Sequence, residues 1–302
     1  MKDIIVIGAG PAGLAAAAYA IRKRLDVLVV SPDVGGKTNH ALTLPWTEEH
    51  QVIRAKEVVE SFKRELDYIG FSHNPGRVKH VDAAAEGFTV HLLSGKTESC
   101  RALVLATGIE RVPLDVPGEV KYLSRGLGYS LVSYSHLFID RSVFLTGNGP
   151  RVLRSAFEVA IHASRVTVNL EPAAEFDAET VKSLGALHNV TIIPGGTVTE
   201  FRGREFAEEV VVRHDDGTIG TIRADGFFVE REPVPSSLPF AHLVSLDERG
   251  RVVVDIDART SRIGIFAAGD LTNVRQEQVL IALGEGAKAA LAAYEYLLSI
   301  NR

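Results

Sequence analysis

Lys2-Asp-Ile-Ile-Val-Ile-Gly-Ala-Gly-Pro-Ala-Gly-Leu14 is the stretch that decides the fold of this chain. It begins with four apolar residues in a row, Ile4 to Ile7, which predict a buried parallel strand. An Ala-rich segment from Leu14 to Ile21 predicts a helix, and a second apolar run, Asp26 to Val30, predicts another strand. Strand, helix and strand in this order are typical of the βαβ unit that binds dinucleotides.

Three glycines between the first strand and the helix have the G-x-G-x-x-G spacing. Gly8 allows a tight turn, Gly10 lets the backbone approach a pyrophosphate, and Gly13 lets helix and strand pack closely. The amino terminus of the helix offers N–H groups and a positive dipole to the phosphates. A plain glycine-rich turn is the alternative, but the flanking strands and helix favour a dinucleotide site.

The length and composition are those of a two-domain globular protein. The chain has 302 residues, too many for one ordinary core, of which 46% are hydrophobic and 24% are charged. A net charge of -5 provides no basic face for nucleic acid, and no apolar run approaches the roughly 20 residues that cross a membrane. The amino terminus enters a strand at once, so we expect no signal peptide and a cytoplasmic location.

The single cysteine, Cys100, excludes a disulfide within the chain. It precedes the apolar run Ala102 to Ala106, where a buried structural residue is the simpler interpretation and a reactive thiol the alternative. The ten histidines show no HxxxH or related spacing, so the sequence predicts no metal site.

A polar, glycine-rich loop, Ser31 to His40, follows the second strand. Many dinucleotide folds place an acid at this point to bind ribose hydroxyls. Here Ser31 stands there and Asp33 follows two residues later, which leaves the ribose contact open. Gly35-Gly36 indicates backbone close to a ligand, with an ordinary loop as the alternative.

The remainder of the first part alternates apolar runs with turns. Apolar residues at helical spacing predict a helix over Ala55 to Ile69, and Pro113, Pro117 and Gly118 mark a linker. The predicted strands are Arg77 to Asp82, Gly87 to Leu93 and Ala102 to Ala106.

A second βαβ unit begins at Ser142, where an apolar strand leads into Gly147-x-Gly149. A helix over Arg151 to Ala163 and a strand over Arg165 to Leu170 complete it, so the chain carries two nucleotide-fold modules. Pro233-Val-Pro235-Ser-Ser predicts a second linker. The later predicted elements are strands at Thr191 to Pro194, Thr197 to Arg202, Glu209 to His214, Thr218 to Arg223, Gly226 to Glu230, Arg251 to Asp255 and Thr260 to Asp270, and a helix at Glu277 to Ser299.

Together these motifs resemble the low-molecular-weight thioredoxin reductase family of two-domain flavoproteins, over nearly the whole chain. The matching residues are Gly8 to Gly13, Gly35-Gly36, Ala106-Thr-Gly108, Gly264 to Asp270, Gln278 and Gly284 to Ala290. The resemblance implies an α/β fold with two Rossmann-like, three-layer ββα dinucleotide-binding domains, the second inserted into the first. An FAD-binding domain would comprise residues 1–112 and 236–302, a degenerate NAD(P)-binding-like domain residues 113–235, and the protein would be a homodimer.

The resemblance also implies which residues bind FAD. Gly8, Gly10 and Gly13 would hold the pyrophosphate, and Asp270 would bind the ribityl chain. Gln278 and Val279 would present backbone N–H groups to the pyrimidine edge of the flavin, where a helix amino terminus stabilises the negative charge of the reduced form. The full set is Gly8, Gly10, Pro11, Ala12, Gly13, Gly35, Gly36, Lys37, Ala106, Thr107, Gly108, Gly269, Asp270, Gln278 and Val279.

One departure from the family concerns its redox disulfide. Ser130 and Ser133 occupy the positions of the family's C-x-x-C, and serine forms neither a disulfide nor a thiolate. The chain therefore cannot reduce thioredoxin by the family mechanism, and no nucleophile-elbow pattern supports a hydrolytic serine. Tyr129, Tyr134 and His136 are candidates for proton donation near the flavin, with a packed aromatic cluster as the alternative.

The other departure concerns the nicotinamide site. Val152 replaces the third small residue of the motif, where helix and strand approach closely. Glu171 stands where NADPH-dependent members carry arginines, so it would repel a 2′-phosphate but could accept hydrogen bonds from the ribose of NADH. The sequence thus argues against NADPH and leaves NADH or a second flavin as the ligand of Gly147, Gly149 and Arg151. Arg151 and Arg154 could hold a phosphate-bearing ligand or form a solvated helix face.

The leading hypothesis is an FAD-dependent oxidoreductase without a redox disulfide, whose electron donor and acceptor are not specified by the sequence. Ferredoxin, NADH or a second flavin could supply the electrons. A disulfide-free ferredoxin–NAD(P) reductase is one alternative. A non-catalytic flavin-binding sensor or partner protein is the other.

Overall fold

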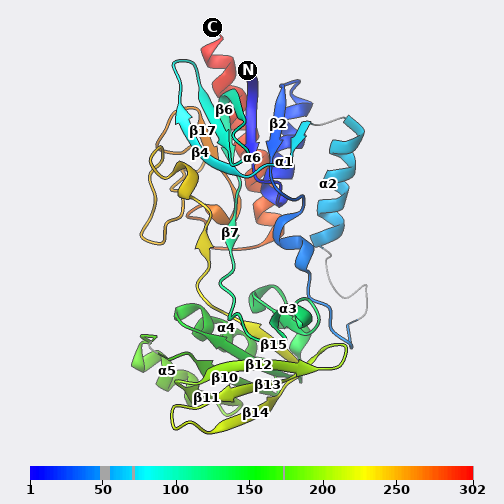
Figure 1. Ribbon diagram of the computed structural model, residues 1–302, viewed down its shortest axis with the longest axis vertical. Coiled ribbons are helices and arrows are strands. Elements are labelled where there is room, and N and C mark those ends of the chain that lie inside the picture. The colour runs from blue at the N-terminus through cyan, green and yellow to red at the C-terminus, as the bar shows by residue number, and fades with distance from the viewer. Residues whose placement is uncertain (48–54, 70–71, 173, 302) are drawn as a thin grey trace. The chain divides into compact units, whose positions relative to one another are not determined.

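The computed structural model of the chain describes residues 1–47, 55–69, 72–172 and 174–301, and it divides into two units (Figure 1). Unit 1 comprises Met1–Asn39, Ile53–Glu110 and Val234–Arg302, and unit 2 comprises His40–Val52 and Arg111–Pro233. The predicted boundaries, after residues 112 and 235, lie two residues later than these changes of unit. Residues 40–47, which the sequence placed in the first domain, group with unit 2.

Unit 1 is built on a sheet whose strands follow the order β3-β2-β1-β6-β5-β4, with β17 also paired to β6. The pairs β3-β2, β2-β1, β1-β6 and β6-β17 are parallel, whereas β4, β5 and β6 form an antiparallel meander. The strands are β1 Lys2–Ile7, β2 Val27–Val30, β3 Ser72–Asn74, β4 Val78–Ala83, β5 Phe88–Leu92, β6 Thr97–Leu105, β7 Ile109–Glu110, β16 Val234–Pro235 and β17 Ile265–Ala267, and the helices are α1 Pro11–Arg22, α2 Ala55–Ile69 and α6 Val279–Ile300.

Alternation along β1 divides the core of unit 1 into two layers. Ile4 and Val6 pack with the alanines of α1 and α6, while Ile5 and Ile7 pack with the apolar side of the β4–β5 meander. The helices α1 and α6 lie against each other (Figure 1). They approach so closely that a Cβ on Gly286 would lie 2.0 Å from the carbonyl oxygen of Ala12. Small side chains on both helices make this contact geometrically feasible.

Unit 2 also has three layers, which are helices, a parallel sheet and an antiparallel sheet. Its parallel sheet has the order β11-β10-β9-β15-β8, and a separate antiparallel sheet has the order β12-β13-β14. One core cluster joins the parallel sheet to α4 and α5, and the other fills the space between the two sheets. The elements are α3 Glu119–Tyr122, β8 Leu127–Gly128, β9 Ser142–Gly147, α4 Pro150–Ala160, β10 Arg165–Leu170, α5 Ala178–Gly185, β11 Val190–Pro194, β12 Thr197–Gly203, β13 Ala207–Arg213, β14 Ile219–Arg223 and β15 Gly226–Val229. The predicted α/β class with two three-layer units is confirmed.

Of two predicted strands near the end of the chain, the first is wrong and the second is shorter than predicted. Arg251 to Asp255 contributes only a bridge at Val252, and within Thr260 to Asp270 only β17 is a strand. In this region Asp247 accepts hydrogen bonds at 2.9 Å from the backbone N–H groups two and four residues later, and Asp255 does the same. Side-chain bonds of this kind stabilise turns at the expense of a strand ladder.

Neither predicted linker is unstructured. Gly118 adopts a left-handed φ of 84° before α3, and a Cβ there would lie 2.1 Å from the carbonyl oxygen of Phe201. The second linker contains β16, which pairs antiparallel with β7. No described helix has the length and apolar character required to cross a bilayer.

Candidate functional site

Two glycines of the first motif occupy positions that admit no side chain. Gly8 has a φ of +104°, and a Cβ there would lie 2.2 Å from the carbonyl oxygen of Ala106. A Cβ on Gly13 would lie 1.9 Å from the carbonyl oxygen of Gly8. The turn and the close packing that the spacing predicted are therefore both present.

Gly10 differs, because a Cβ at this position would meet nothing within 4 Å. It is the N-cap of α1 with Pro11 as the first helical residue, and no side chain in the described part of the chain caps this helix. Gly36 lies beside Gly10, since its own Cβ would come within 3.2 Å of the Gly10 Cα atom. The amino terminus of α1 therefore has open space beside Gly10, as an anion-binding helix terminus requires.

A charged group borders this loop. The Lys37 Nζ atom lies 2.6 Å from Oδ2 of Asp270 and 3.5 Å from Oε2 of Glu277. Asp270 belongs to a 3-10 helix, Gly269–Leu271, that is anchored where the Gly269 N–H group donates to Glu285 at 2.9 Å. Burial raises the pKa of Glu285 above its usual value.

Gln278 is the N-cap of α6, and Val279 is its first residue. The predicted helix began two residues earlier, at Glu277. Within the described ranges α6, like α1, has no side-chain cap. Ala106, Thr107 and Gly108 follow the end of β6, and the Thr107 hydroxyl donates to the Ser236 carbonyl at 2.8 Å. We call Gly8, Gly10, Gly13, Gly36, Lys37, Asp270 and Gln278 the nucleotide cradle of unit 1.

The second motif, in unit 2, has a tighter loop. A Cβ on Gly147 would lie 2.5 Å from the carbonyl oxygen of Glu230 and 2.8 Å from the Cβ atom of Val152. Val152 is fully buried in the first turn of α4. The sequence predicted that Val152 would hinder close packing of helix and strand. The absence of a side chain at Gly147 provides the room that the Val152 side chain needs.

Arg151 points into the interior of unit 2 and forms a buried ion pair. Its Nε atom lies 2.8 Å from Oε2 of Glu230, and the two side chains are 7% and 0% exposed. The other carboxylate oxygen of Glu230 accepts the Leu131 N–H group at 2.6 Å. Desolvation raises the pKa of Glu230, and the charge of Arg151 opposes that shift. The guanidinium that the sequence assigned to a phosphate or to a solvated helix face is thus engaged with Glu230.

Two further acids surround the start of α4. Glu232 accepts the backbone N–H group of Arg151 at 3.1 Å. Glu171 follows β10 directly, and its backbone N–H group donates to the Gly147 carbonyl at 3.0 Å. Its carboxylate accepts from Nε of Arg231 at 2.9 and 3.0 Å. Sequence reasoning found Glu171 but missed Glu230, Glu232 and Arg231, which follow a strand without any local motif.

The proton-donor candidates all lie in unit 2. Tyr129 donates to Glu119 and has Arg111 above its ring, and burial with the Glu119 contact raises its pKa. The Tyr134 hydroxyl accepts the Leu42 N–H group at 3.1 Å, while His136 is exposed. Tyr129 and Tyr134 also pack against apolar clusters, which agrees with the packed-aromatic alternative.

Ser130 is the N-cap and Ser133 the last residue of a short 3-10 helix, Leu131–Ser133, whose first N–H group donates to Glu230. Cys100 belongs to unit 1, in β6, and is fully buried. Desolvation raises the pKa of this thiol to about 12, so it is not a thiolate at neutral pH. The buried structural interpretation of Cys100 is confirmed.

Two solved structures of similar fold are thioredoxin reductases. That of Streptococcus pyogenes MGAS5005 has a TM-score of 0.90 at 27% identity, covering 99% of both chains. That of Giardia duodenalis has a TM-score of 0.86 at 26% identity, covering 98% of this chain and 99% of its own.

Curated relatives carry a different name. The F subunit of alkyl hydroperoxide reductase is 32% identical over 304 residues in Pseudomonas putida and 32% identical over 310 residues in Escherichia coli (strain K12). Each alignment covers 98% of this chain but 58% of the relative, so the chain spans less than two thirds of their length. The profile of the pyridine nucleotide-disulphide oxidoreductase family matches residues 2–286. Because that match covers most of the chain and reaches into both units, the chain belongs to the pyridine nucleotide-disulphide oxidoreductase family.

Proposed function

We propose that this chain is an FAD-dependent oxidoreductase that accepts electrons from NADH and holds no redox disulfide of its own. The observation that carries the proposal is the nucleotide cradle of unit 1. Gly8 and Gly13 leave no room for a side chain, whereas Gly10 has room and faces open space. The uncapped starts of α1 and α6 supply the N–H groups that a pyrophosphate and a reduced flavin ring require. These residues fit FAD.

Within the cradle each group has a definite task. Bound FAD supplies the acceptor for a hydride and the donor of one or two electrons. The N–H groups at Gly10 and the first turn of α1, with the Lys37 ammonium, would hold the pyrophosphate. Asp270 would accept a hydrogen bond from a ribityl hydroxyl, and the N–H group of Val279 would stabilise negative charge on the flavin.

The proposed absence of a redox disulfide rests on the cysteine content of the chain. Cys100 is the only cysteine of the chain, and its buried thiol has a pKa raised to about 12. Ser130 and Ser133 stand where the family resemblance places the C-x-x-C. Electrons must then pass from the flavin to an external acceptor, for which a small redox protein such as ferredoxin is one candidate and a small-molecule oxidant another.

The preference for NADH rests on Glu171. This acid directly follows the second strand of the βαβ unit, the usual place for a carboxylate that binds ribose hydroxyls. Its pairing with Arg231 fixes its position but also neutralises part of its charge. We therefore propose discrimination against the 2′-phosphate of NADPH that is moderate rather than absolute.

Anaerobic titration of the FAD-loaded protein tests the proposal. NADH is expected to bleach the flavin absorbance with a stoichiometry near one, and NADPH to require at least tenfold higher concentration. A flavin that is bleached by dithionite but by neither nucleotide would contradict NADH as donor, and would favour a ferredoxin donor or a sensor. Purified protein that binds no FAD would overturn the whole proposal.

Glu171→Gln separates the two cofactors. The substitution removes the negative charge that would repel a 2′-phosphate and releases Arg231 to meet that phosphate, so the ratio of kcat/KM for NADH over NADPH should fall at least tenfold. Glu205→Gln, an exposed acid of the same unit, is the matched control. An unchanged ratio in Glu171→Gln would exclude Glu171 as the selective residue.

A further inference from the structure

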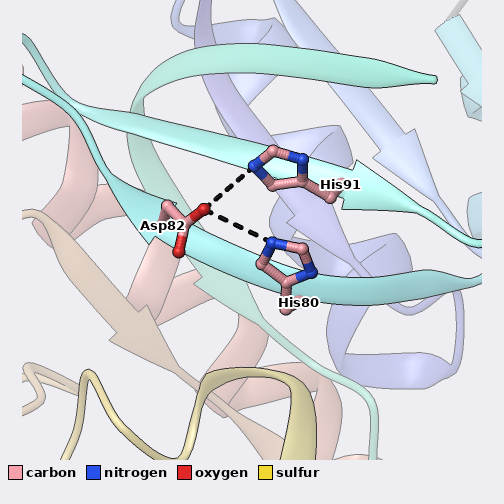
Figure 2. Close-up of side chains that lie close together, drawn as sticks. All are labelled: His80, Asp82 and His91. Carbon is pink, nitrogen blue, oxygen red and sulfur yellow. Dashed lines mark ion pairs between the residues drawn. The ribbon is translucent and has the colours of Figure 1, made fainter. Parts of the chain in front are cut away.

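The outer face of the β4–β5 hairpin in unit 1 carries two histidines and an aspartate that converge (Figure 2). His80 and Asp82 lie two residues apart on β4, which places them on one face of the strand. His91 of β5 is the direct cross-strand partner of His80. Val81 and Val90, the neighbours of these residues, point the other way into the core. The hairpin register thus holds three metal-ligating side chains together.

The two nitrogen–oxygen distances of the cluster are close to those between ligands of a tetrahedral metal site. The Nε2 atom of His80 lies 3.3 Å from Oδ2 of Asp82, and Nε2 of His91 lies 3.1 Å from the same oxygen. Two ligands of a tetrahedral Zn²⁺ ion, each bonded at about 2.0–2.1 Å, lie about 3.3–3.4 Å apart. The ligand atoms of all three residues lie within 4.8 Å of one another. A small retraction of the carboxylate would admit the ion.

The two imidazoles face the same carboxylate, and their rings would turn to place one shared ion in both ring planes. Their rings stack with centroids 4.2 Å apart and planes 10° from parallel. In Figure 2 both rings direct a nitrogen atom at the carboxylate. A single carboxylate oxygen faces two ring nitrogens in this arrangement, and a divalent cation between them would bind all three groups at once. The side chains of His80, His91 and Asp82 are 40%, 30% and 53% exposed, so an ion can reach them from solvent.

We propose that His80, Asp82 and His91 form a binding site for a divalent first-row transition metal ion, with Zn²⁺ and Cu²⁺ preferred over Mg²⁺ and Ca²⁺. Two imidazoles and one carboxylate suit zinc, copper and nickel, whereas magnesium and calcium prefer sites made of oxygen alone. Water would complete the coordination. The bound ion would join β4 to β5, and the site shares no residue with the nucleotide cradle. The proposal therefore stands independently of the proposed redox function.

The sequence predicted no metal site because its histidines show none of the spacings that place ligands on one helix or loop. Here a His-x-Asp pair lies on one strand and the third ligand comes from the next strand. Only the antiparallel register, which pairs His80 with His91, brings them together. The spacing rules for helices and zinc knuckles do not describe such a site.

Metal titration of the tag-free, FAD-loaded protein, after treatment with a chelator, tests the proposal. Calorimetry should show one Zn²⁺ ion bound per chain and no comparable binding of Mg²⁺. His80→Ala, His91→Ala and Asp82→Asn should each weaken Zn²⁺ binding at least tenfold. His242→Ala, which removes an exposed histidine elsewhere in unit 1, should leave the binding unchanged. Because Asp82→Asn preserves shape, its result remains informative if an alanine variant folds poorly.

Electron paramagnetic resonance of the Cu²⁺-loaded protein supplies a second readout, since oxidised flavin is diamagnetic. The spectrum should show superhyperfine coupling to two imidazole nitrogens, which falls to one in His91→Ala. Zn²⁺ binding that is not stoichiometric, or that survives in Asp82→Asn and His91→Ala, would overturn the site. Equal loss of binding in His242→Ala would also overturn it, since the ion would then be held by scattered histidines.

Discussion

The buried ion pair between Glu230 and Arg151 should be the most sensitive single interaction in unit 2. Replacing Glu230 with Gln keeps the shape and an acceptor for the Leu131 N–H group but removes the carboxylate from Arg151. Breaking a buried pair in this way costs about 3–5 kcal/mol, because one charge remains in a desolvated site. We take this range because Glu230 and Arg151 are 0% and 7% exposed. Loss of a surface pair would cost about 1 kcal/mol or less.

Trp46 makes this loss measurable. It is the only tryptophan of the chain and belongs to unit 2, where its indole N–H group donates to the Leu137 carbonyl at 3.1 Å. Its ring also meets Phe138 edge-on, with centroids 5.8 Å apart. Its fluorescence during urea unfolding therefore reports the stability of unit 2. The expected result is a free energy of unfolding lower by about 3–5 kcal/mol in Glu230→Gln.

A double variant distinguishes the ion pair from mere packing. Glu230→Leu combined with Arg151→Met replaces both charges with apolar groups, and should recover most of the stability lost in Glu230→Gln. The exposed Glu205→Gln should stay within about 0.5 kcal/mol of the parent. A cost below about 1 kcal/mol in Glu230→Gln would refute the prediction. A double variant as unstable as the sum of the losses measured in Glu230→Leu alone and Arg151→Met alone would also refute it.

Three further predictions concern unit 1. Gly286→Ala should separate α1 from α6 and reduce the flavin content of the purified protein several-fold, since its Cβ would lie 2.0 Å from the Ala12 carbonyl oxygen. The control Gly284→Ala, whose Cβ would meet nothing within 4 Å, should retain full flavin. Equal flavin content in the two variants would contradict this prediction. The native protein should present no thiol to a disulfide reagent at pH 8, and one thiol after denaturation, because Cys100 is fully buried; a fast native reaction would disprove that burial. Burial raises the pKa of Cys100 to about 12 from 9.0, so the protonated thiol contributes fully to stability below pH 9 and this contribution is lost as the pH rises toward 12. The free energy of unfolding should fall in this range by up to about 1.4 kcal/mol per pH unit. In Cys100→Ala, urea unfolding at each pH should lack this slope.

The architecture could be predicted from the sequence because its signals are local. A run of four apolar residues followed by Gly8, Gly10 and Gly13 fixes strand, turn and helix within a few residues. There is no room for a side chain at Gly13, so the glycine spacing also predicts the close packing of the helix against the strand. The same holds for the second motif, although Val152 shows that a pattern can tolerate an exception when Gly147 provides the room.

What the sequence could not give was the choice of distant partners. Glu171 was identified from its place after a strand, yet its charge is compensated by Arg231, sixty residues later. His80 and His91 meet only because β4 and β5 pair in one register. The strand predicted to end at Asp255 does not form, and the Asp255 carboxylate accepts hydrogen bonds from two backbone N–H groups instead. A pattern of apolar residues does not predict such bonds. Each case depends on tertiary contacts that have no signature in a short window.

The pairing of α1 with α6 has a consequence for how this chain is made. The alanine turn of α1, Ala15 to Ala18, is fully buried in the folded protein. Its partner helix, α6, is the last element described along the chain. During synthesis α1 leaves the ribosome early, and all of unit 2 is translated before α6 is available. Unit 2 can therefore fold first while unit 1 waits with an exposed apolar surface, the condition under which nascent chains recruit chaperones.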